Sequence, residues 1–215
     1  MKRIIVAQPK NESLLANLEC LYKCFREANG EKVHFDLSGV KWKSPLLLSA
    51  IAAYIHSTGS TYESGVDSYL DYVRFPKGVS SIRAFEEARQ RSKTYIPISV
   101  LKKENGSGRE RLESLFIDMV KSILAAQHPG VHDAISYPIT EIVTNVLEHS
   151  GAEKGLIFAQ YYQTKKYLDI CIVDTGRGLS ASYKEEKGLE FSDEEAIEEA
   201  MNGHSTKKDK ERGYG

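Results

Sequence analysis

Two apolar segments joined by a short polar connection constrain the fold of this chain more than any other feature. The segments cover residues 156–162 and 167–174, and Gln163-Thr164-Lys165-Lys166 connects them. A connection this short joins neighbouring antiparallel strands. We therefore expect a β-hairpin in the second half of the chain, and a further strand over 95–101.

A helical pattern lies between that further strand and the hairpin. Apolar residues recur along one helical face from Leu112 to Leu124. A glycine-containing loop is expected before them, over 104–108, and Pro129-Gly130 is expected to end the helix.

A second helix is expected over about 131–149, with Pro138 either kinking it or starting its main part. After the hairpin, residues 180–212 are polar, charged and interrupted by glycines. We expect only one short helix there, around 194–201.

The first part of the chain alternates between strand and helix patterns. A strand over 4–7 precedes a helix that Asn11 is expected to cap and Gly30 to end. A second strand follows over 33–37, and Ser44-Pro45 opens a second helix. This order favours a small α/β layer with a partly parallel sheet.

The middle of the chain has no clean period. Residues 46–55 continue the second helix and Gly59 ends it, whereas 60–92 alternate irregularly apart from a helix expected over 84–91. We place a domain boundary at Ser92-Lys93. The chain is thus expected to contain an α/β module over 1–92 and a second domain over 93–215.

The composition is that of an ordinary globular protein. Of 215 residues, 41% are hydrophobic and 27% charged, with a formal net charge of -1. This balance gives no general reason to expect nucleic-acid or membrane binding. No apolar run is long enough for a signal peptide or a membrane span, and we expect a cytoplasmic protein.

The three cysteines have no framework spacing, which argues against a disulfide scaffold and for a reducing compartment. Cys20 and Cys24 are one helical turn apart, and we interpret them as thiols that pack a helix. Cys171 lies in the second strand of the hairpin.

One helix of the second half carries a polar face beside its apolar stripe. The stripe is expected to consist of four apolar residues: Ile139, Ile142, Val143 and Val146. Four polar residues share another side: Glu141, Asn145, Glu148 and His149. The carboxylate, amide and imidazole groups there form either a ligand site or a solvated face.

Two glycine-containing segments follow. The apolar strand 170–173 runs into Asp174-Thr175-Gly176-Arg177-Gly178, where glycines permit a tight turn and close approach of a ligand. A plain glycine turn is the alternative. Gly213-Tyr214-Gly215 at the end of the sequence suits a backbone turn that cradles phosphate, or simply a loop.

In this order, the three segments resemble the motifs of the GHKL ATPase superfamily, which includes histidine-kinase catalytic domains, DNA gyrase and heat-shock chaperone ATPases. Glu141-Ile142-Val143-Thr144-Asn145 resembles the N-box. Asp174-Thr175-Gly176-Arg177-Gly178 resembles the first glycine box and Gly213-Tyr214-Gly215 the second. The resemblance covers about 95–215. It implies an α/β sandwich, namely a Bergerat-type two-layer ATP-binding domain.

The resemblance also implies roles for the N-box residues, with ATP and Mg²⁺ as cofactors. Asn145 matches the asparagine that holds the magnesium bound to the nucleotide phosphates, and an amide oxygen suits this hard cation. Glu141 matches the acid that orients or deprotonates the attacking oxygen, and is therefore the expected catalytic residue.

The glycine boxes are expected to bind the nucleotide itself. Asp174 matches the aspartate that accepts a hydrogen bond from the adenine amino group. The glycines that match the adenine pocket and the phosphate-contacting turn are Gly176, Gly178, Gly213 and Gly215. Residues 180–212 match the ATP lid. Because such a domain continues after its second glycine box, we expect it to be incomplete in these 215 residues, with a mobile lid and a site that is empty or weakly occupied.

Within the superfamily, the chain is most similar to the anti-sigma-factor serine kinases. They share the glutamate four residues before Asn145, and His149 four residues after it. No histidine has the His-Glu-x-x-x-Pro surroundings of a phospho-accepting histidine.

The first module agrees with this branch. Phe35-Asp36-Leu37-Ser38-Gly39-Val40, followed by Ser44-Pro45, resembles STAS domains, the fold of anti-sigma antagonists. The chain departs from the family at its Asp-Ser-Ser-Gly motif and reads Lys41-Trp42-Lys43-Ser44-Pro45 instead. Ser44 is either a phosphorylation site or simply a helix N-cap.

We therefore expect a Mg-ATP-binding ATPase or serine/threonine kinase of bacterial-type signalling, with a regulatory or phospho-accepting protein partner and a possible homodimer. The alternative is a module with little catalysis whose protein interactions are gated by nucleotide.

Overall fold

The computed structural model describes residues 1–89, 94–103, 106–125 and 134–204, and within them the chain forms a mixed α/β fold with two sheets and eight helices. The strands are β1 (Lys2–Ile5), β2 (Val33–Asp36), β3 (Thr61–Glu63), β4 (Tyr95–Lys102), β5 (Lys154–Tyr162) and β6 (Tyr167–Asp174). The helices are α1 (Leu14–Ala28), α2 (Pro45–Thr58), α3 (Ser68–Tyr72), α4 (Ile82–Ala88), α5 (Gly106–Ala125), α6 (Ser136–His149), α7 (Gly178–Lys187) and α8 (Asp193–Met201).

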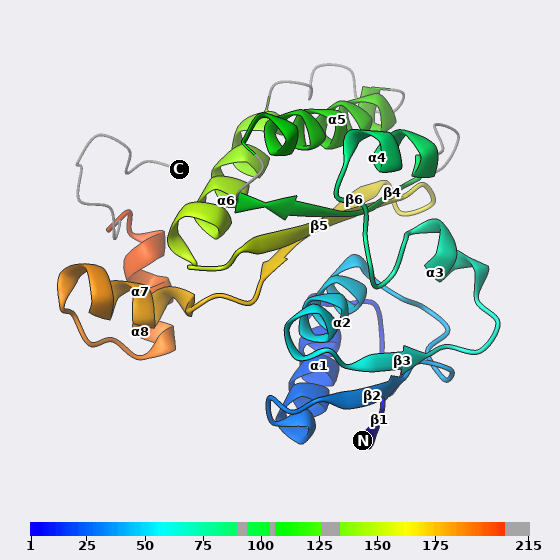
Figure 1. Ribbon diagram of the computed structural model, residues 1–215, viewed down its shortest axis with the longest axis horizontal. Coiled ribbons are helices and arrows are strands. Elements are labelled where there is room, and N and C mark those ends of the chain that lie inside the picture. Colours follow the sequence, from blue (N-terminus) through cyan, green and yellow to red (C-terminus); the bar gives the residue numbers. More distant parts are fainter. Residues whose placement is uncertain (90–93, 104–105, 126–133, 205–215) are drawn as a thin grey trace.

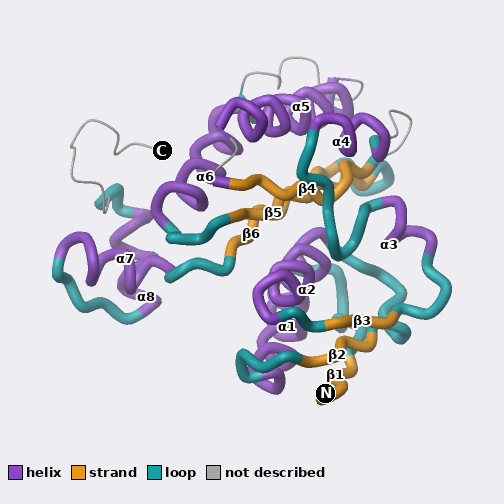
Figure 2. Tube along the Cα trace, viewed as in Figure 1, coloured by secondary structure: helices purple, strands orange, loops and turns teal. Residues whose placement is uncertain are grey.

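The two sheets are stacked with α2 between them (Figure 1). The first is parallel, in the order β1-β2-β3, and the second is antiparallel, in the order β4-β5-β6. Helices α5 and α6 cover the face of the second sheet that points away from α2 (Figure 2). This arrangement confirms the parallel layer and the hairpin expected from the sequence.

Local signals place α2 as expected. The Ser44 side chain caps its first turn by accepting a hydrogen bond from the Leu47 amide, and Pro45 occupies the first turn. At the other end Gly59 adopts φ +68, a left-handed conformation that glycine reaches at little cost. Leu48 and Ile51 within the helix are both 0% exposed, because α2 is covered by a sheet on each side.

The cap of the helix α1 lies two residues after the expected residue, and its end lies one residue before the expected one. Asn11 is not the cap: its side chain accepts a hydrogen bond from the Ser13 amide, and Ser13 in turn caps α1. At the other end, Asn29 takes the left-handed position directly after the helix, so Gly30 lies one residue beyond it. Asparagine tolerates both roles because its side chain hydrogen-bonds locally.

Three further expectations need correction. Residues 106–108 belong to α5 and not to a loop, since the first turn of a helix needs no internal partner for its N–H groups and accepts glycine and serine. The helix expected over 84–91 is α4, which starts earlier because Ser81 caps it. The strand β3 and the helix α3, both short, lie where no element was expected.

One hydrophobic core joins the first sheet, α2 and the facing side of the second sheet. Phe35 of β2 and Phe158 of β5 both belong to it and are 0% exposed. A second core lies between the other face of the second sheet and α4, α5 and α6, with Phe116 at 0% exposure. The expected boundary at Ser92-Lys93 and the stop at Pro129-Gly130 lie outside the described residues.

Candidate functional site

The helix α6 presents the expected polar residues, but its buried stripe differs from the prediction. Ile139, Val143 and Leu147 are at most 3% exposed, whereas Ile142 is 48% exposed. The inward direction runs along the 139, 143, 147 row, and Ile142 is rotated about 100° away from it. Ile142 was therefore wrongly assigned to the buried stripe.

The polar face of α6 lies opposite that buried row. Glu141 is half-buried and Asn145 is exposed, so the amide of Asn145 is accessible to a ligand. Glu148 is also exposed, and the side chain of His149 lies outside the described part of the structure. The carboxylate and the amide thus lie one turn apart on one side of the helix, as the sequence predicted.

The C-terminal end of α6 meets the loop after β6 directly. The Arg177 amide donates a hydrogen bond of 2.7 Å to the Ser150 carbonyl oxygen. A Cβ atom at Gly176 would lie 2.2 Å from this oxygen, which is an impossible contact. Gly176 therefore has to be glycine, because the backbone of Ser150 occupies the space of a side chain.

The Ser150 side chain stabilises this junction from the helix side. Its hydroxyl donates to the Val146 carbonyl within the last turn of α6, and accepts a hydrogen bond of 3.0 Å from the Ala152 amide. Ser150 thus stabilises the turn between α6 and β5 with its side chain, and binds the loop after β6 with its carbonyl oxygen.

Asp174 lies at the last position of β6, opposite Gly155 of β5. It is half-buried, and its Oδ1 atom accepts a hydrogen bond of 2.7 Å from the Gly176 amide. Within the described part of the chain, its other carboxylate oxygen has no hydrogen-bond partner. One oxygen therefore shapes the loop, and the second is available to accept a hydrogen bond from a ligand.

Arg177 and Gly178 lead from this loop into α7. Gly178 has φ +78 and begins the helix. The Arg177 guanidinium forms ion pairs with Glu185 and Glu186 and donates a hydrogen bond of 2.9 Å to the Ser182 hydroxyl. The loop after β6 thus contacts α7 through the Arg177 side chain and α6 through the Arg177 amide.

The sequence predicted only one short helix within residues 180–212, and this prediction was wrong. Two helices, α7 and α8, lie there and pack together, with the Tyr183 and Phe191 rings 5.3 Å apart. The helix α7 could not be recognised from its sequence, because only a few of its side chains, such as Tyr183 at 3% exposure, are buried. Its sequence is therefore mostly polar. Residues 205–212 lie outside the described ranges.

A buried carboxyl group near the polar face was missed by the sequence analysis. Glu113 of α5 is 8% exposed and hydrogen-bonds to Thr140, the neighbour of Glu141 on α6. Burial raises the pKa of Glu113, while the Thr140 hydrogen bond and the charge of Arg109 lower it. The sequence feature that could have indicated a buried carboxyl group is the position of Glu113 directly after Leu112, at the edge of the apolar stripe.

The structure therefore brings the first two of the three motifs together. The helix with Glu141 and Asn145 ends against the loop with Asp174, Gly176 and Gly178. Gly213 and Gly215 lie outside the described residues. Among the residues that the structure describes, no three His, Cys, Asp or Glu side chains are grouped so that they could hold a metal ion.

Comparisons of the chain with models of protein families, with curated proteins and with solved structures found no match. Over the described ranges, none of the helices is both long and apolar enough to cross a membrane.

Proposed function

We propose that this chain binds Mg-ATP in a GHKL-type site between α6 and the loop that joins β6 to α7. The junction between Ser150 and the Gly176-Arg177 backbone carries the proposal, because α6, whose residues resemble an N-box, contacts the loop whose residues resemble the first glycine box. The three-stranded antiparallel sheet with α5 and α6 on one face supports a Bergerat-type domain. The motif order along the chain supplies the rest of the argument.

The adenine end of the site is assigned to Asp174. Its Oδ1 atom is engaged by the Gly176 amide, which fixes the orientation of the carboxylate. The second oxygen would accept a hydrogen bond from the adenine amino group. Guanine carries a carbonyl at the corresponding position, so two acceptors would meet there and the site would discriminate against GTP.

Magnesium is assigned to Asn145. Its exposed amide suits a hard cation, and the described chain offers no cluster of carboxylates as a site of its own. This donor set fits a magnesium ion that arrives with the nucleotide and takes its other ligands from phosphates and water. When bound, the ion would neutralise charge on the phosphates.

Glu141 is assigned as the general base. Its half-buried carboxylate lies one turn before Asn145, on the same side of α6. From that position it would accept a proton from the attacking oxygen, either of water in an ATPase or of a serine or threonine hydroxyl in a kinase. The choice between the two reactions depends on the protein partner.

The experiment compares Mg-ATP, Mg-GTP and ATP with excess chelator, using calorimetric titration and turnover assays. We expect ATP to bind, GTP to bind less tightly, and Asn145→Ala to remove the effect of magnesium. Glu141→Gln should retain binding and reduce turnover at least about a hundredfold. Equal affinities for ATP and GTP, or an effect of magnesium that persists in Asn145→Ala, would refute the proposal.

A second candidate function is a nucleotide-gated interaction module with little catalysis. One observation favours it: α2 of the first module packs directly on β5 and β6, the strands that lead to the nucleotide loop. A change at the end of β6 would therefore reach the first module through a shared core. This function is supported if ATP binds without measurable turnover and Glu141→Gln changes nothing.

The first module is proposed to be STAS-like and to hold the protein partner, with a homodimer as one form of that partnership. Its parallel sheet with α1 and α2 supports the proposal. Phosphorylation of Ser44 is not included, since its side chain is buried. The Ser44 hydroxyl donates a hydrogen bond of 2.7 Å to Asn17 and accepts one from the Leu47 amide.

A further inference from the structure

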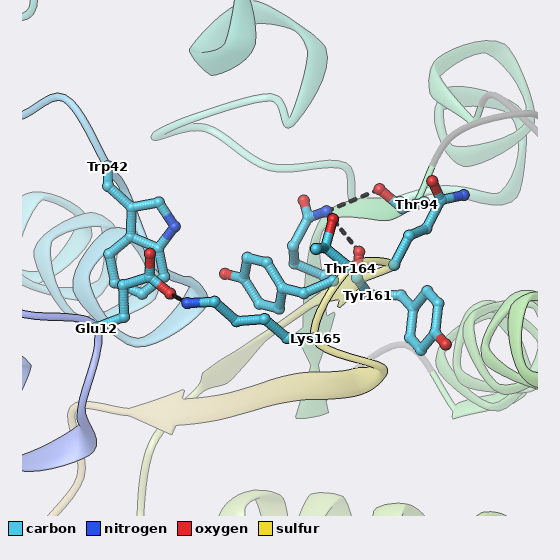
Figure 3. A pocket seen from close by; sticks show the side chains of 9 residues that line it. Glu12, Trp42, Thr94, Tyr161, Thr164 and Lys165 are labelled. Atoms are coloured by element: carbon cyan, nitrogen blue, oxygen red, sulfur yellow. Dashed lines mark hydrogen bonds and ion pairs between the residues drawn. The ribbon is translucent and has the colours of Figure 1, made fainter.

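A cavity of about 330 Å³ lies where the turn of the β5–β6 hairpin meets the first module (Figure 3). Its walls include Trp42 and Glu12 from the first module, and Tyr162 and Lys165 from the hairpin. Asp174 lies at the opposite end of β6, so this cavity is separate from the proposed nucleotide site.

The cavity already contains an ammonium group of the chain. Lys165 forms an ion pair with Glu12, as Figure 3 shows, although the two residues are far apart in sequence. Their side chains are 51% and 40% exposed. An ion pair this exposed contributes little to stability, so another cation could replace Lys165, whose ammonium would return to water.

Aromatic rings line the space beside this ion pair. The ring centroids of Trp42 and Tyr162, which both line the cavity, are 6.0 Å apart. Tyr162 also packs against Tyr167, with ring centroids 4.7 Å apart. The faces of such rings carry negative potential and attract organic cations. An alkyl chain would in addition bury apolar surface against them.

A second carboxylate lies next to the cavity wall, since Asp169 pairs in register with Gln160, which lines the cavity. Asp169 of β6 is half-buried and forms no ion pair within the described part of the chain. Burial raises the pKa of Asp169. Burial also raises the pKa of Tyr162, and the charge of the nearby Asp169 contributes to that increase. The carboxylate of Glu12, once released by Lys165, would compensate the charge of a bound cation.

From these observations we propose that the cavity binds an alkylammonium cation, which displaces Lys165 from Glu12 and packs its alkyl chain against Trp42 and Tyr162. The Lys165 ammonium is then an internal competitor for the site. The ligand is either a free amine or the lysine side chain of another protein. The proposal is independent of the nucleotide-binding function.

Trp42 is the single tryptophan, so its fluorescence reports on this cavity alone. The probe is n-butylammonium, titrated in parallel by calorimetry, with 1-butanol as its neutral counterpart. Lys165→Gln should bind the probe about twofold to fivefold more tightly, because it removes the competitor. Glu12→Gln should bind it roughly tenfold more weakly or not at all.

Lys166→Gln is the matched control, because it removes the same charge from the same turn without touching the ion pair with Glu12. Its affinity should equal that of the unmodified chain. Equal gains in Lys165→Gln and Lys166→Gln, binding of 1-butanol as tight as that of the amine, or no saturable binding by either method would overturn the proposal.

The source of the cation is tested with a blocked lysine, Nα-acetyl-lysine N-methylamide, in the same titrations. Tighter binding of this probe than of n-butylammonium supports the proposal with a protein lysine as ligand. Tighter binding of n-butylammonium supports it with a free amine as ligand.

Discussion

Replacing Gly176 by alanine tests the junction on which the candidate site depends. The added Cβ atom would lie 2.2 Å from the carbonyl oxygen of Ser150 and 2.6 Å from its Cβ atom. Both neighbours sit on backbone that α6 holds in place, so no flexible side chain can move aside. The loop has to shift, and the 2.7 Å hydrogen bond from Arg177 to Ser150 is lost.

The cost follows from three contributions. A forced shift of packed groups costs about 1–3 kcal/mol, and the lost hydrogen bond costs about 1 kcal/mol. The reduced conformational freedom of the unfolded chain returns about 0.4–1 kcal/mol. We therefore expect Gly176→Ala to lower the free energy of unfolding by about 1–3.5 kcal/mol.

Urea unfolding measures this difference, and amide hydrogen exchange at Arg177 locates it. Gly39→Ala is the matched control, because a Cβ atom at Gly39 has no neighbour within 4 Å and its φ is not positive. We expect the control to be close to the unmodified protein. Equal midpoints for the two variants, with the Arg177 amide still protected, would refute the geometry of the junction.

Two predictions concern the first module. Ser44→Ala should lower the free energy of unfolding by about 1–3 kcal/mol in urea, because α2 loses its cap and Asn17 loses the donor to its side-chain oxygen. An unchanged midpoint would contradict this. Hydrogen bonds from Ser38 first, and then from Arg3, lower the pKa of Asp36 to about 2. The stabilisation by the Asp36 carboxylate should thus be complete above about pH 4 and be lost as the pH falls toward 2. In Asp36→Asn, the free energy of unfolding should change less between about pH 4 and pH 2 than in the unmodified chain. An equal change in the two proteins would contradict this prediction.

The sequence predicted those elements whose ends carry strong local signals. The helix α2 is bounded by Ser44-Pro45 and Gly59, and the hairpin by a short polar turn, so both were placed correctly. Each of these signals acts through neighbouring residues in the chain.

Elements that depend on tertiary contacts were missed. The strand β3 is only three residues long and gains its backbone partners from β2, far away in sequence. The helix α7 begins with Gly178 and has few buried residues, so its sequence shows little apolar periodicity. Nothing local distinguishes such segments from loop.

The candidate site was predicted in part. The shared face of Glu141 and Asn145 follows from helical spacing, but the direction of the buried row does not, which explains the error at Ile142. The proximity of α6 to the loop after β6 could be expected only from the resemblance to known ATPases. Only the structure shows why residue 176 has to be glycine, since the Ser150 backbone occupies the space of a side chain there.

The most direct test of the account is the affinity for Mg-ATP of the unmodified chain, Asp174→Asn and Asp118→Asn, measured by calorimetric titration. Asp118 is an exposed aspartate of α5 and controls for the lost charge. We expect the unmodified chain and Asp118→Asn to bind ATP with equal affinity. Asp174→Asn should bind it about tenfold or more weakly. Equal binding by all three folded proteins would contradict a nucleotide site at the end of β6.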